Sequence, residues 1–191
     1  MKFMYFFYPA LPATIEERKR LRPIARHSEY WQKMFAEIAE LSRIAEDAGF
    51  EAVAFPEHHL HTEGGEMGSL PLLTQYVISQ TSRVKVGPIG IGWKQCLHFF
   101  GFTEAFRSPE DDMKYPNKQL LPPSECTMER LERADFALVG TTSDIRRKMD
   151  QLVENASPEW FIWQSDQGYV PLEYVKKVLI RFGKQILPHY V

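Results

Sequence analysis

The sequence predicts an α/β fold built on a parallel β-sheet. Three observations support this. The first 90 residues alternate between strand-like and helix-like patterns in the order β-α-β-α-β, which is typical of parallel α/β proteins. Residues 52–55 are continuously apolar, as a strand covered on both faces requires. The chain has 191 residues, 44% of them hydrophobic, so one domain with a sizeable core is expected.

The N-terminal part predicts a buried strand followed by a long helix. Residues 2–8 are apolar and aromatic, and Pro9 ends them, so a strand is expected there. Residues 10–29 are polar and basic. A helix is predicted from about Tyr30 to Ala48, with Gly49 at its left-handed C-cap. Its apolar face comprises Met34, Ile38, Leu41, Ala45 and Ala48.

The strand at 52–55 leads into three further predicted segments. Residues 58–68 form a polar loop that contains glycine, residues 70–80 form a helix, and residues 83–90 form the next strand. Residues 92–135 contain four prolines and an acidic cluster at 110–112, so a largely irregular connection is expected there. Aromatic residues in its first part indicate that it packs against the rest of the protein.

Regular structure is expected again near the C-terminus. Thr141 and Asp144 resemble a capping box, and the helix that follows is expected to bury Ile145, Met149, Leu152 and Val153. Residues 159–163 predict a buried strand. Pro171 then opens a last helix at its favoured first position. The apolar face of this helix comprises Leu172, Val175, Leu179, Phe182 and Ile186.

Charge and cysteine usage exclude several classes of protein. The net charge is -2 and the pI about 6.3, so no general attraction to nucleic acid or anionic membrane is expected. Cys96 and Cys126 form no CxxC pair, and neither a disulfide framework nor a zinc ribbon is predicted. No apolar run is long enough to span a membrane, and prolines interrupt the apolar N-terminus. We therefore expect a cytoplasmic protein.

Several segments together carry a resemblance to a known family. They are Ala45-Glu-Asp-Ala-Gly-Phe50, Phe55-Pro-Glu-His-His59, Thr81-Ser-Arg-Val-Lys-Val-Gly87, Leu138-Val-Gly-Thr141 and the tail from Glu159 to His189. In this order the chain resembles the luciferase-like flavin-dependent monooxygenases (the bacterial luciferase-like family). The resemblance covers roughly residues 1–90 and 136–191.

The resemblance implies part of a TIM barrel. A complete barrel has eight parallel strands and typically about 250 residues, whereas this chain passes from the third strand directly to the helix before the eighth. We therefore expect a single truncated luciferase-like domain over residues 1–191, with parts at 1–90, 91–135 and 136–191. Its four parallel strands would lie in the barrel order 8-1-2-3, with helices outside and a long irregular insert. Such a sheet has two open edges and a bare inner face, which either the insert or a second copy (a homodimer or other oligomer) would cover.

The same resemblance implies chemistry. Family members use reduced flavin and O2 to oxidise a small organic substrate such as an aldehyde, and the cofactor here would be reduced FMN or F420. His58 aligns with the histidine that contributes to this chemistry. A histidine exchanges protons near neutrality because its unperturbed pKa is about 6.5. No nicotinamide fingerprint is visible, so a separate flavin reductase is expected.

Other residues are expected to shape the cofactor site. Glu57 and His59 flank His58, and Ile89 with Gly90 matches the family's peptide beneath the flavin ring, where glycine permits close approach to the backbone. Both features also have a purely structural explanation. The histidines could form hydrogen bonds within their loop, and Gly90 could serve a tight turn after Pro88. The basic run from Arg18 to Arg26 could bind the flavin phosphate, although a solvated charged surface is the more favoured reading.

Rival hypotheses stay open. His58, His59, His61, Glu57, Glu63 and Glu66 are dense enough to suggest zinc or iron, but their spacing matches no established metal signature, and no metal is expected. Trp160 and Trp163, with the aromatics at 93–106, could stack on a flavin, although buried aromatics are more often core. The functional alternatives are a non-catalytic flavin- or ligand-binding remnant of the fold, a partner subunit, or a truncated gene product without stable function.

Overall fold

The structure is a computed structural model that describes residues 1–56, 69–88, 107–116, 121, 125, 127–133, 138–166 and 170–191. It divides into two compact units. The first, here called the sheet unit, comprises Met1–Gly90 and Pro158–Val191. The second, here called the insert unit, comprises Ile91–Ser157.

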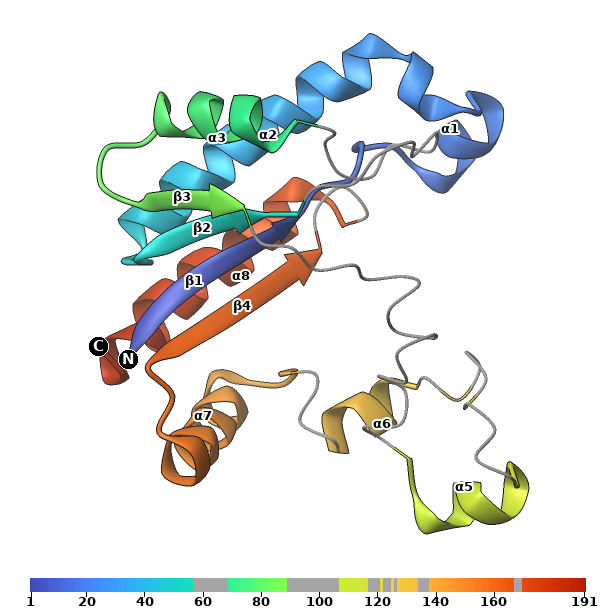
Figure 1. The fold of residues 1–191 in the computed structure, drawn as a ribbon, viewed down its shortest axis with the longest axis vertical. Coiled ribbons are helices and arrows are strands. Elements are labelled where there is room, and N and C mark those ends of the chain that lie inside the picture. Colours follow the sequence, from blue (N-terminus) through green and yellow to red (C-terminus); the bar gives the residue numbers. More distant parts are fainter. Residues whose placement is uncertain are drawn as a thin grey trace. The chain divides into compact units, whose positions relative to one another are not determined.

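The sheet unit contains one parallel four-stranded sheet (Figure 1). Its strands are β1 (Lys2–Tyr8), β2 (Ala52–Phe55), β3 (Lys85–Pro88) and β4 (Trp160–Asp166). Their spatial order is β3-β2-β1-β4. This confirms the predicted partial barrel, because β4 takes the place of the eighth strand beside the first.

Three helices cover one face of this sheet (Figure 1). They are α2 (Ser28–Asp47), α3 (Leu70–Ile78) and α8 (Leu172–Gln185). The short elements of the unit are α1 (Ile15–Arg20) and the 3-10 helices η1 (Ile24–Arg26) and η4 (Leu187–His189). Each of the three long helices follows a strand and returns across the sheet, as parallel strand connections require.

The face under the helices is an aromatic core. Alternation along the strands places Phe3, Tyr5 and Phe7 on this face, and all three are buried. The register pairs Phe3 with Phe161 and Tyr5 with Trp163. The ring of Phe182 on α8 lies 5.9 Å from Phe3 and 4.7 Å from Trp163, stacked on the latter. The core thus joins the two ends of the chain through aromatic contacts.

The opposite face corresponds to the inside of a barrel. The strand register places two rows of residues there: Ile162–Met4–Ala52–Lys85, and Gln164–Phe6–Ala54–Gly87 nearer the carboxyl ends of the strands. Phe6 is 1% exposed, whereas Ile162 on the edge strand β4 is 49% exposed. Ala52 and Ala54 of β2 are also buried, at 5% and 2% exposed, so the inner face is covered at β2 and at Phe6 and is more exposed toward the edge strands.

Most predicted boundaries hold, and the exceptions have local causes. Gly49 has φ +94°, which confirms the left-handed cap after α2. The predicted end of the last strand at residue 163 is wrong, because β4 continues to Asp166. Residues 164–166 are polar, so hydrophobic periodicity does not identify them as strand. They are in the strand because the pairing with β1 extends to Tyr8–Asp166. Pro171 is the N-cap of α8 rather than its first residue.

The two ends of the chain meet in the sheet unit. The amino group of Met1 donates a hydrogen bond to the carbonyl oxygen of Tyr190, 2.8 Å away, and Figure 1 shows the two termini side by side. The Lys2 N–H donates to the carbonyl oxygen of Glu159 at 2.8 Å, directly before β4. Residues from opposite ends of the sequence thus start neighbouring strands.

The insert unit contains α5 (Pro109–Lys114), α6 (Met128–Arg133) and α7 (Thr142–Ala156). Two of these short helices fall within residues 92–135, where an irregular connection was predicted. The capping box at the start of α7 is confirmed, with the Thr141 and Asp144 side chains bonded to each other's backbone N–H groups. Of the four residues that α7 was expected to bury, Met149 is fully buried and the other three are half-buried.

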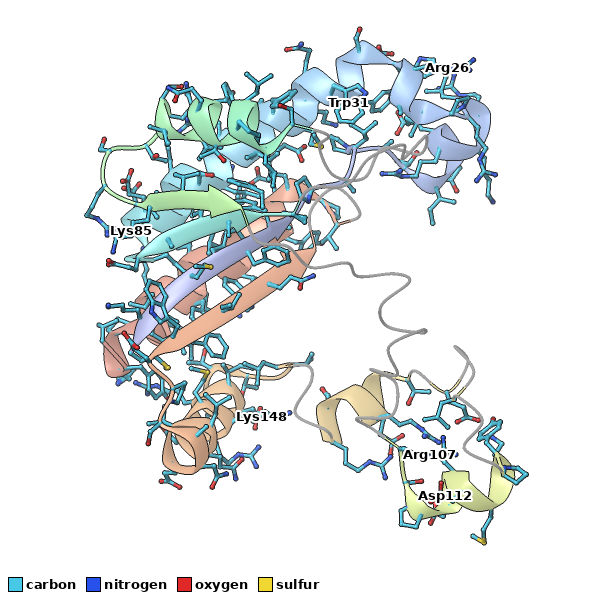
Figure 2. The ribbon with its side chains drawn as sticks, viewed as in Figure 1. Arg26, Trp31, Lys85, Arg107, Asp112 and Lys148 are labelled. Carbon is cyan, nitrogen blue, oxygen red and sulfur yellow. The ribbon has the colours of Figure 1, made fainter. Side chains whose placement is uncertain are left out.

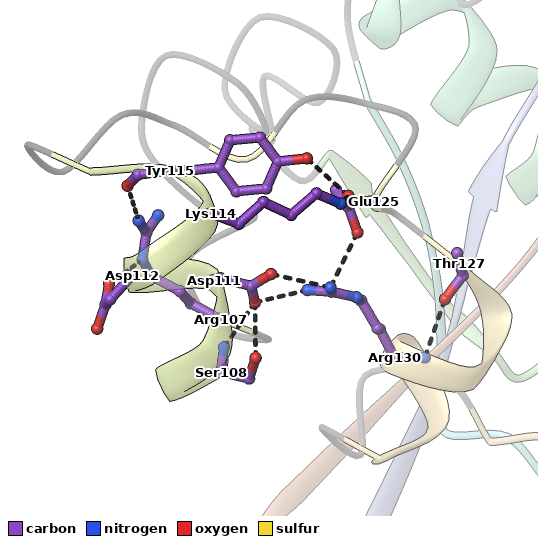
Figure 3. A network of polar contacts seen from close by, with 9 residues as sticks. All are labelled: Arg107, Ser108, Asp111, Asp112, Lys114, Tyr115, Glu125, Thr127 and Arg130. Atoms are coloured by element: carbon purple, nitrogen blue, oxygen red, sulfur yellow. Dashed lines mark hydrogen bonds and ion pairs between the residues drawn. The ribbon is translucent and has the colours of Figure 1, made fainter.

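A polar network, here called the clasp, joins α5 to the start of α6 (Figure 3). Arg130 donates two hydrogen bonds to Asp111, at 2.7 and 2.9 Å, and one to Glu125 at 2.9 Å. Asp111 is 2% exposed and also caps α5 by accepting from the N–H of Ser108 at 2.8 Å. The hydrogen bonds from Arg130, and then those from Ser108, hold the pKa of Asp111 well below its usual range.

None of the helices that the structure describes is both long and apolar enough to cross a membrane.

Candidate functional site

The carboxyl ends of β2 and β3 lie side by side in the sheet unit. Phe55 at the end of β2 pairs with Pro88 at the end of β3. The predicted site residues follow these two positions directly: Glu57, His58 and His59 after β2, and Ile89 and Gly90 after β3. These five residues lie outside the described residues. The structure does bring together the two strand ends from which they continue, at the edge where parallel α/β proteins place their catalytic side chains.

Below this edge, packed aromatic rings support the strand ends. Phe7 stacks on Phe55 with ring centroids 5.0 Å apart, and Tyr5 contacts Phe7 at 4.5 Å in an edge-to-face arrangement. All three side chains are buried on the helix-covered face. Aromatic contacts of this kind limit movement of the strand ends, so the segments that continue from β1 and β2 start from fixed positions.

The inner row nearest this edge contains Gln164, Phe6, Ala54 and Gly87. Ala54 of β2 is 2% exposed, and Gly87 of β3 pairs with it in register. A Cβ added at Gly87 would meet no atom within 4 Å. The backbone of β3 is therefore accessible from the inner face, and a planar ligand could approach it closely. These residues are compatible with a flavin at this edge.

Two of these features were missed by the sequence analysis. The glycine expected to permit close approach was Gly90, and the structure adds Gly87, which lies three residues earlier in the sequence and within β3. Gln164 lies in the same inner row, on β4, and is half-buried. Its amide can both donate and accept hydrogen bonds. The available signal was the polar run at residues 164–166 directly after an apolar strand.

The two tryptophans of β4 are structural. Trp163 stacks on Phe182 at 4.7 Å and on Phe50 at 6.0 Å, on the helix-covered face. Trp160 starts the strand, and Lys2 Nζ lies 5.2 Å from its ring centroid. Neither ring lies at the carboxyl ends of the strands, which supports the core reading over flavin stacking. The aromatics at 93–106 lie outside the described residues.

The basic residues between Arg18 and Arg26 differ in exposure. Arg18 is half-buried and its guanidinium donates to the backbone carbonyls of Leu11 and Ala13. The remaining members are exposed: Lys19, Arg20, Arg22 and Arg26. Figure 2 labels Arg26 and Trp31; the indole N–H of Trp31 donates to the carbonyl oxygen of Ala25 at 2.8 Å. The arrangement favours the solvated reading over a built phosphate site.

Glu46 and Glu51 stabilise the fold at the start of β3. Glu46 accepts from the backbone N–H groups of Ser82 at 3.0 Å and Val84 at 2.8 Å, just before β3. Glu51 accepts from Lys85 Nζ at 2.6 Å, at the start of β3 (Figure 2). Both lie at the amino ends of the strands, away from the candidate site.

The metal hypothesis concerns residues that the structure leaves undescribed. All six candidate ligands lie between residues 57 and 66. Within the described parts of the chain, no group of three or more histidine, cysteine, aspartate or glutamate side chains is arranged to hold a metal ion.

Comparisons with known proteins agree with the fold. Residues 1–90 match the family described as luciferase-like monooxygenase, which confirms the resemblance over that part of the chain. No curated protein matches the chain. Among solved structures, the crystal structure of the monooxygenase RslO1 from Streptomyces bottropensis is similar, with a TM-score of 0.61 and 14% sequence identity. The alignment covers 100% of each chain, and at this identity the similarity is one of fold.

Proposed function

We propose that this chain, whose residues 1–90 match the luciferase-like monooxygenases, binds reduced flavin at the carboxyl ends of its strands and oxidises a small organic substrate with O2. The observation that carries the proposal is the paired ending of β2 and β3, with Phe55 opposite Pro88. Two segments therefore continue from neighbouring positions. One contains Glu57, His58 and His59, and the other contains Ile89 and Gly90.

The described residues support a planar cofactor at this edge. The open space beside Gly87 leaves the backbone of β3 accessible from the inner face, while its neighbour Ala54 on β2 is small and buried. Gln164 supplies an amide in the same row, which suits the mixed donor and acceptor edge of a flavin ring. Bound reduced flavin would supply the activation of O2.

His58 is the proposed proton-exchanging residue. It lies three residues beyond the end of β2, within the loops that hold catalytic side chains in barrels. An imidazole can give or take a proton near neutrality. Glu57 and His59 would orient it. A separate reductase would supply the reduced flavin, FMN or F420.

The runner-up is a protein of the same fold that binds flavin or a small ligand without turnover, alone or as a partner subunit. The lysine and arginines between residues 19 and 26 are exposed, so the described residues include no built site for the flavin phosphate. Weak flavin binding without turnover would be consistent with this. A binder of this kind retains the open space beside Gly87 and lacks substrate oxidation.

An anaerobic titration with reduced FMN, and separately with reduced F420, tests binding. We expect a dissociation constant in the micromolar range, corresponding to roughly −8 kcal/mol. Turnover is then measured with a flavin reductase, a panel of saturated aldehydes and 18O2. The balanced reaction converts aldehyde, O2 and reduced flavin into carboxylic acid, water and oxidised flavin, so one 18O atom is expected in the acid.

The variant His58→Ala is expected to lose about 99% of acid formation or more while keeping flavin affinity, because general acid–base groups contribute on the order of 10²–10⁴-fold. The matched control is His189→Ala, since His189 is exposed in η4 near the chain termini. Binding without 18O incorporation supports the runner-up. Absence of binding to either flavin at roughly 100 μM, which corresponds to about −5.5 kcal/mol, contradicts the proposed function and the flavin-binding form of the runner-up.

A further inference from the structure

The sheet of the sheet unit is half of a closed barrel in strand number and polarity. In the part of the chain that the structure describes, it has four strands, all parallel, in the order β3-β2-β1-β4. A closed barrel of this class has eight parallel strands. Among the described residues, β3 pairs only with β2, and β4 pairs only with β1. The half-barrel therefore has two edges, and they belong to different strands.

Both edges direct backbone groups outward that have no strand partner among the described residues. The Lys85 N–H donates to Glu51 O at 3.0 Å, toward β2. Because alternate residues of a parallel strand direct their backbone groups to opposite sides, the N–H and C=O groups of Val86 point to the free edge of β3. The same argument applies to β4. Glu159 O accepts from Lys2 on the β1 side, so the backbone groups of Ile162 and Gln164 point to its free edge.

The inner face has an exposed apolar position at one of these edges. Ile162 is 49% exposed, on the inner face of β4 and in the row that contains Met4. The other face is packed against α2 and α8 and is closed by stacked aromatic rings. A seven-residue edge strand with an exposed aliphatic side chain is a template for further pairing.

We propose that a second copy of this chain completes the barrel. A two-fold axis along the barrel axis would place β3 of each copy beside β4 of its partner. Eight parallel strands would then run β3-β2-β1-β4-β3-β2-β1-β4 around a closed ring. Two-fold symmetry is the commonest symmetry of homo-oligomers. A second copy is the fitting occupant because it supplies four parallel strands and both complementary edges, so that no edge is left open. An antiparallel pairing of two β4 strands would leave both β3 edges unpaired.

This arrangement would also complete the mouth at which the candidate site lies. The carboxyl end of β3 leads into Ile89 and Gly90, and in the single chain its outer side has no paired strand among the described residues. In the dimer, the carboxyl end of the partner's β4 would lie beside it. The inference rests on the sheet geometry and not on the proposed activity, so either can fail without the other.

The test is the oligomeric state, measured by analytical ultracentrifugation over roughly 1–100 μM, a range in which the apparent stability of a dimer depends on concentration. The expected result is a dimer of the 22.3 kDa chain. Ile162→Lys is expected to lower the dimer fraction at least tenfold, because it places a charge in the closed barrel interior. Val178→Lys is the matched control. Val178 is 52% exposed on α8, outside the proposed interface, so this variant should stay dimeric.

A second variant removes only an edge hydrogen bond. Val86→Pro deletes an N–H that points to the free edge, and proline is tolerated on edge strands. It should therefore give a folded monomer, with circular dichroism as the check on folding. Amide hydrogen exchange provides a measurement that needs no variant. The amides of Val86, Ile162 and Gln164 should be protected in the wild-type protein.

Three results overturn the proposal. One is a wild-type protein that stays monomeric throughout the concentration range, in which case the chain's own residues 91–157 become the candidate cover. Another is a dimer that persists in both Ile162→Lys and Val86→Pro. The third is a dimer in which the amides of Val86 and Ile162 exchange as fast as those of an unfolded strand.

Discussion

Gly183 on α8 lies against Ala48 at the end of α2. A Cβ added at Gly183 would lie 2.4 Å from the Ala48 Cβ and 3.0 Å from its Cα and carbonyl oxygen. Real atoms do not approach so closely, and backbone atoms cannot rotate away as a flexible side chain can. The two helices therefore pack at a distance that only glycine permits at position 183.

Gly183→Ala should lower the free energy of unfolding by about 1–3 kcal/mol, since an added methyl in a packed region forces backbone shifts. Urea unfolding measures the change. Gly87→Ala is the matched control, because a Cβ there meets no atom within 4 Å and the change should be below about 0.5 kcal/mol. Ala48→Gly combined with Gly183→Ala should recover part of the loss. Equal effects of the two single glycine substitutions would contradict this packing.

Glu46 fastens the start of β3 to the end of α2. It accepts from the backbone N–H groups of Ser82, Arg83 and Val84. Burial alone would raise the pKa of Glu46, but these hydrogen bonds outweigh it and the pKa is lowered. A lowered folded pKa stabilises the protein above the ordinary carboxyl pKa, and this contribution is lost as pH falls through the folded value.

Glu46→Gln should therefore destabilise the protein at pH 7 by about 1 kcal/mol, and the difference from wild type should shrink toward pH 3. Thermal unfolding at several pH values measures it. Asp47→Asn, an exposed neighbour on the same helix, serves as the control and should change little. A difference that stays constant between pH 7 and pH 3 would argue against the carboxylate as the cause.

Glu37 is a buried carboxyl on α2, 8% exposed. Burial raises its pKa, with Lys33 acting against the rise and Glu40 adding to it. A raised folded pKa means that the group favours folding below the ordinary carboxyl pKa and opposes it as pH rises. Glu37→Gln should therefore increase the melting temperature at pH 7 and leave it nearly unchanged at pH 4. A loss of stability at pH 7 would show that the carboxylate has a favourable partner.

The clasp around Arg130 predicts a local effect. Asp111→Asn and Arg130→Gln remove the paired hydrogen bonds between α5 and α6. We expect limited proteolysis between residues 107 and 133 to accelerate several-fold, because local opening governs cleavage. Arg147→Gln removes an exposed ion pair with Asp144 on α7 and is the control. Unchanged cleavage rates in both clasp variants would mean that other contacts hold these helices.

The open space beside Gly87 predicts an effect on ligand binding. Gly87→Val adds a branched side chain where the inner face of β3 is free, and valine suits a strand. Folding should be preserved and affinity for reduced FMN should fall at least tenfold, about 1.4 kcal/mol. Ala36→Val, at an exposed position of α2, is the control. Full flavin affinity in Gly87→Val would place the flavin elsewhere.

The sequence predicted the sheet well because its strands differ strongly from their surroundings. β1 carries the buried aromatic residues Phe3, Tyr5, Phe6 and Phe7, and residues 52–55 are buried and apolar throughout. The β3-β2-β1-β4 order followed from the resemblance at both ends of the chain. Hydrophobic periodicity failed at the polar end of β4, where pairing with Phe6–Tyr8 rather than side-chain burial extends the strand.

The insert was less predictable for a physical reason. Its helices α5 and α6 are held by the Asp111–Arg130 pair, a contact between residues far apart in sequence that leaves no periodic signal. Gly87 was likewise not identified, because the accessibility of its inner side depends on which neighbours the strand acquires. The site residues His58, Glu57, His59, Ile89 and Gly90 stay predictions.

The meeting of Met1 with Tyr190 has a consequence for how the chain folds. β1 and β4 pair although they start at opposite ends of the sequence, so this pairing must close a loop that includes the whole insert unit, and loop closure costs conformational entropy. A circular permutant that joins Val191 to Met1 and opens the chain before β4 would make every paired strand a sequence neighbour. Its contact order would fall and its refolding rate should rise, with the same sheet at the end.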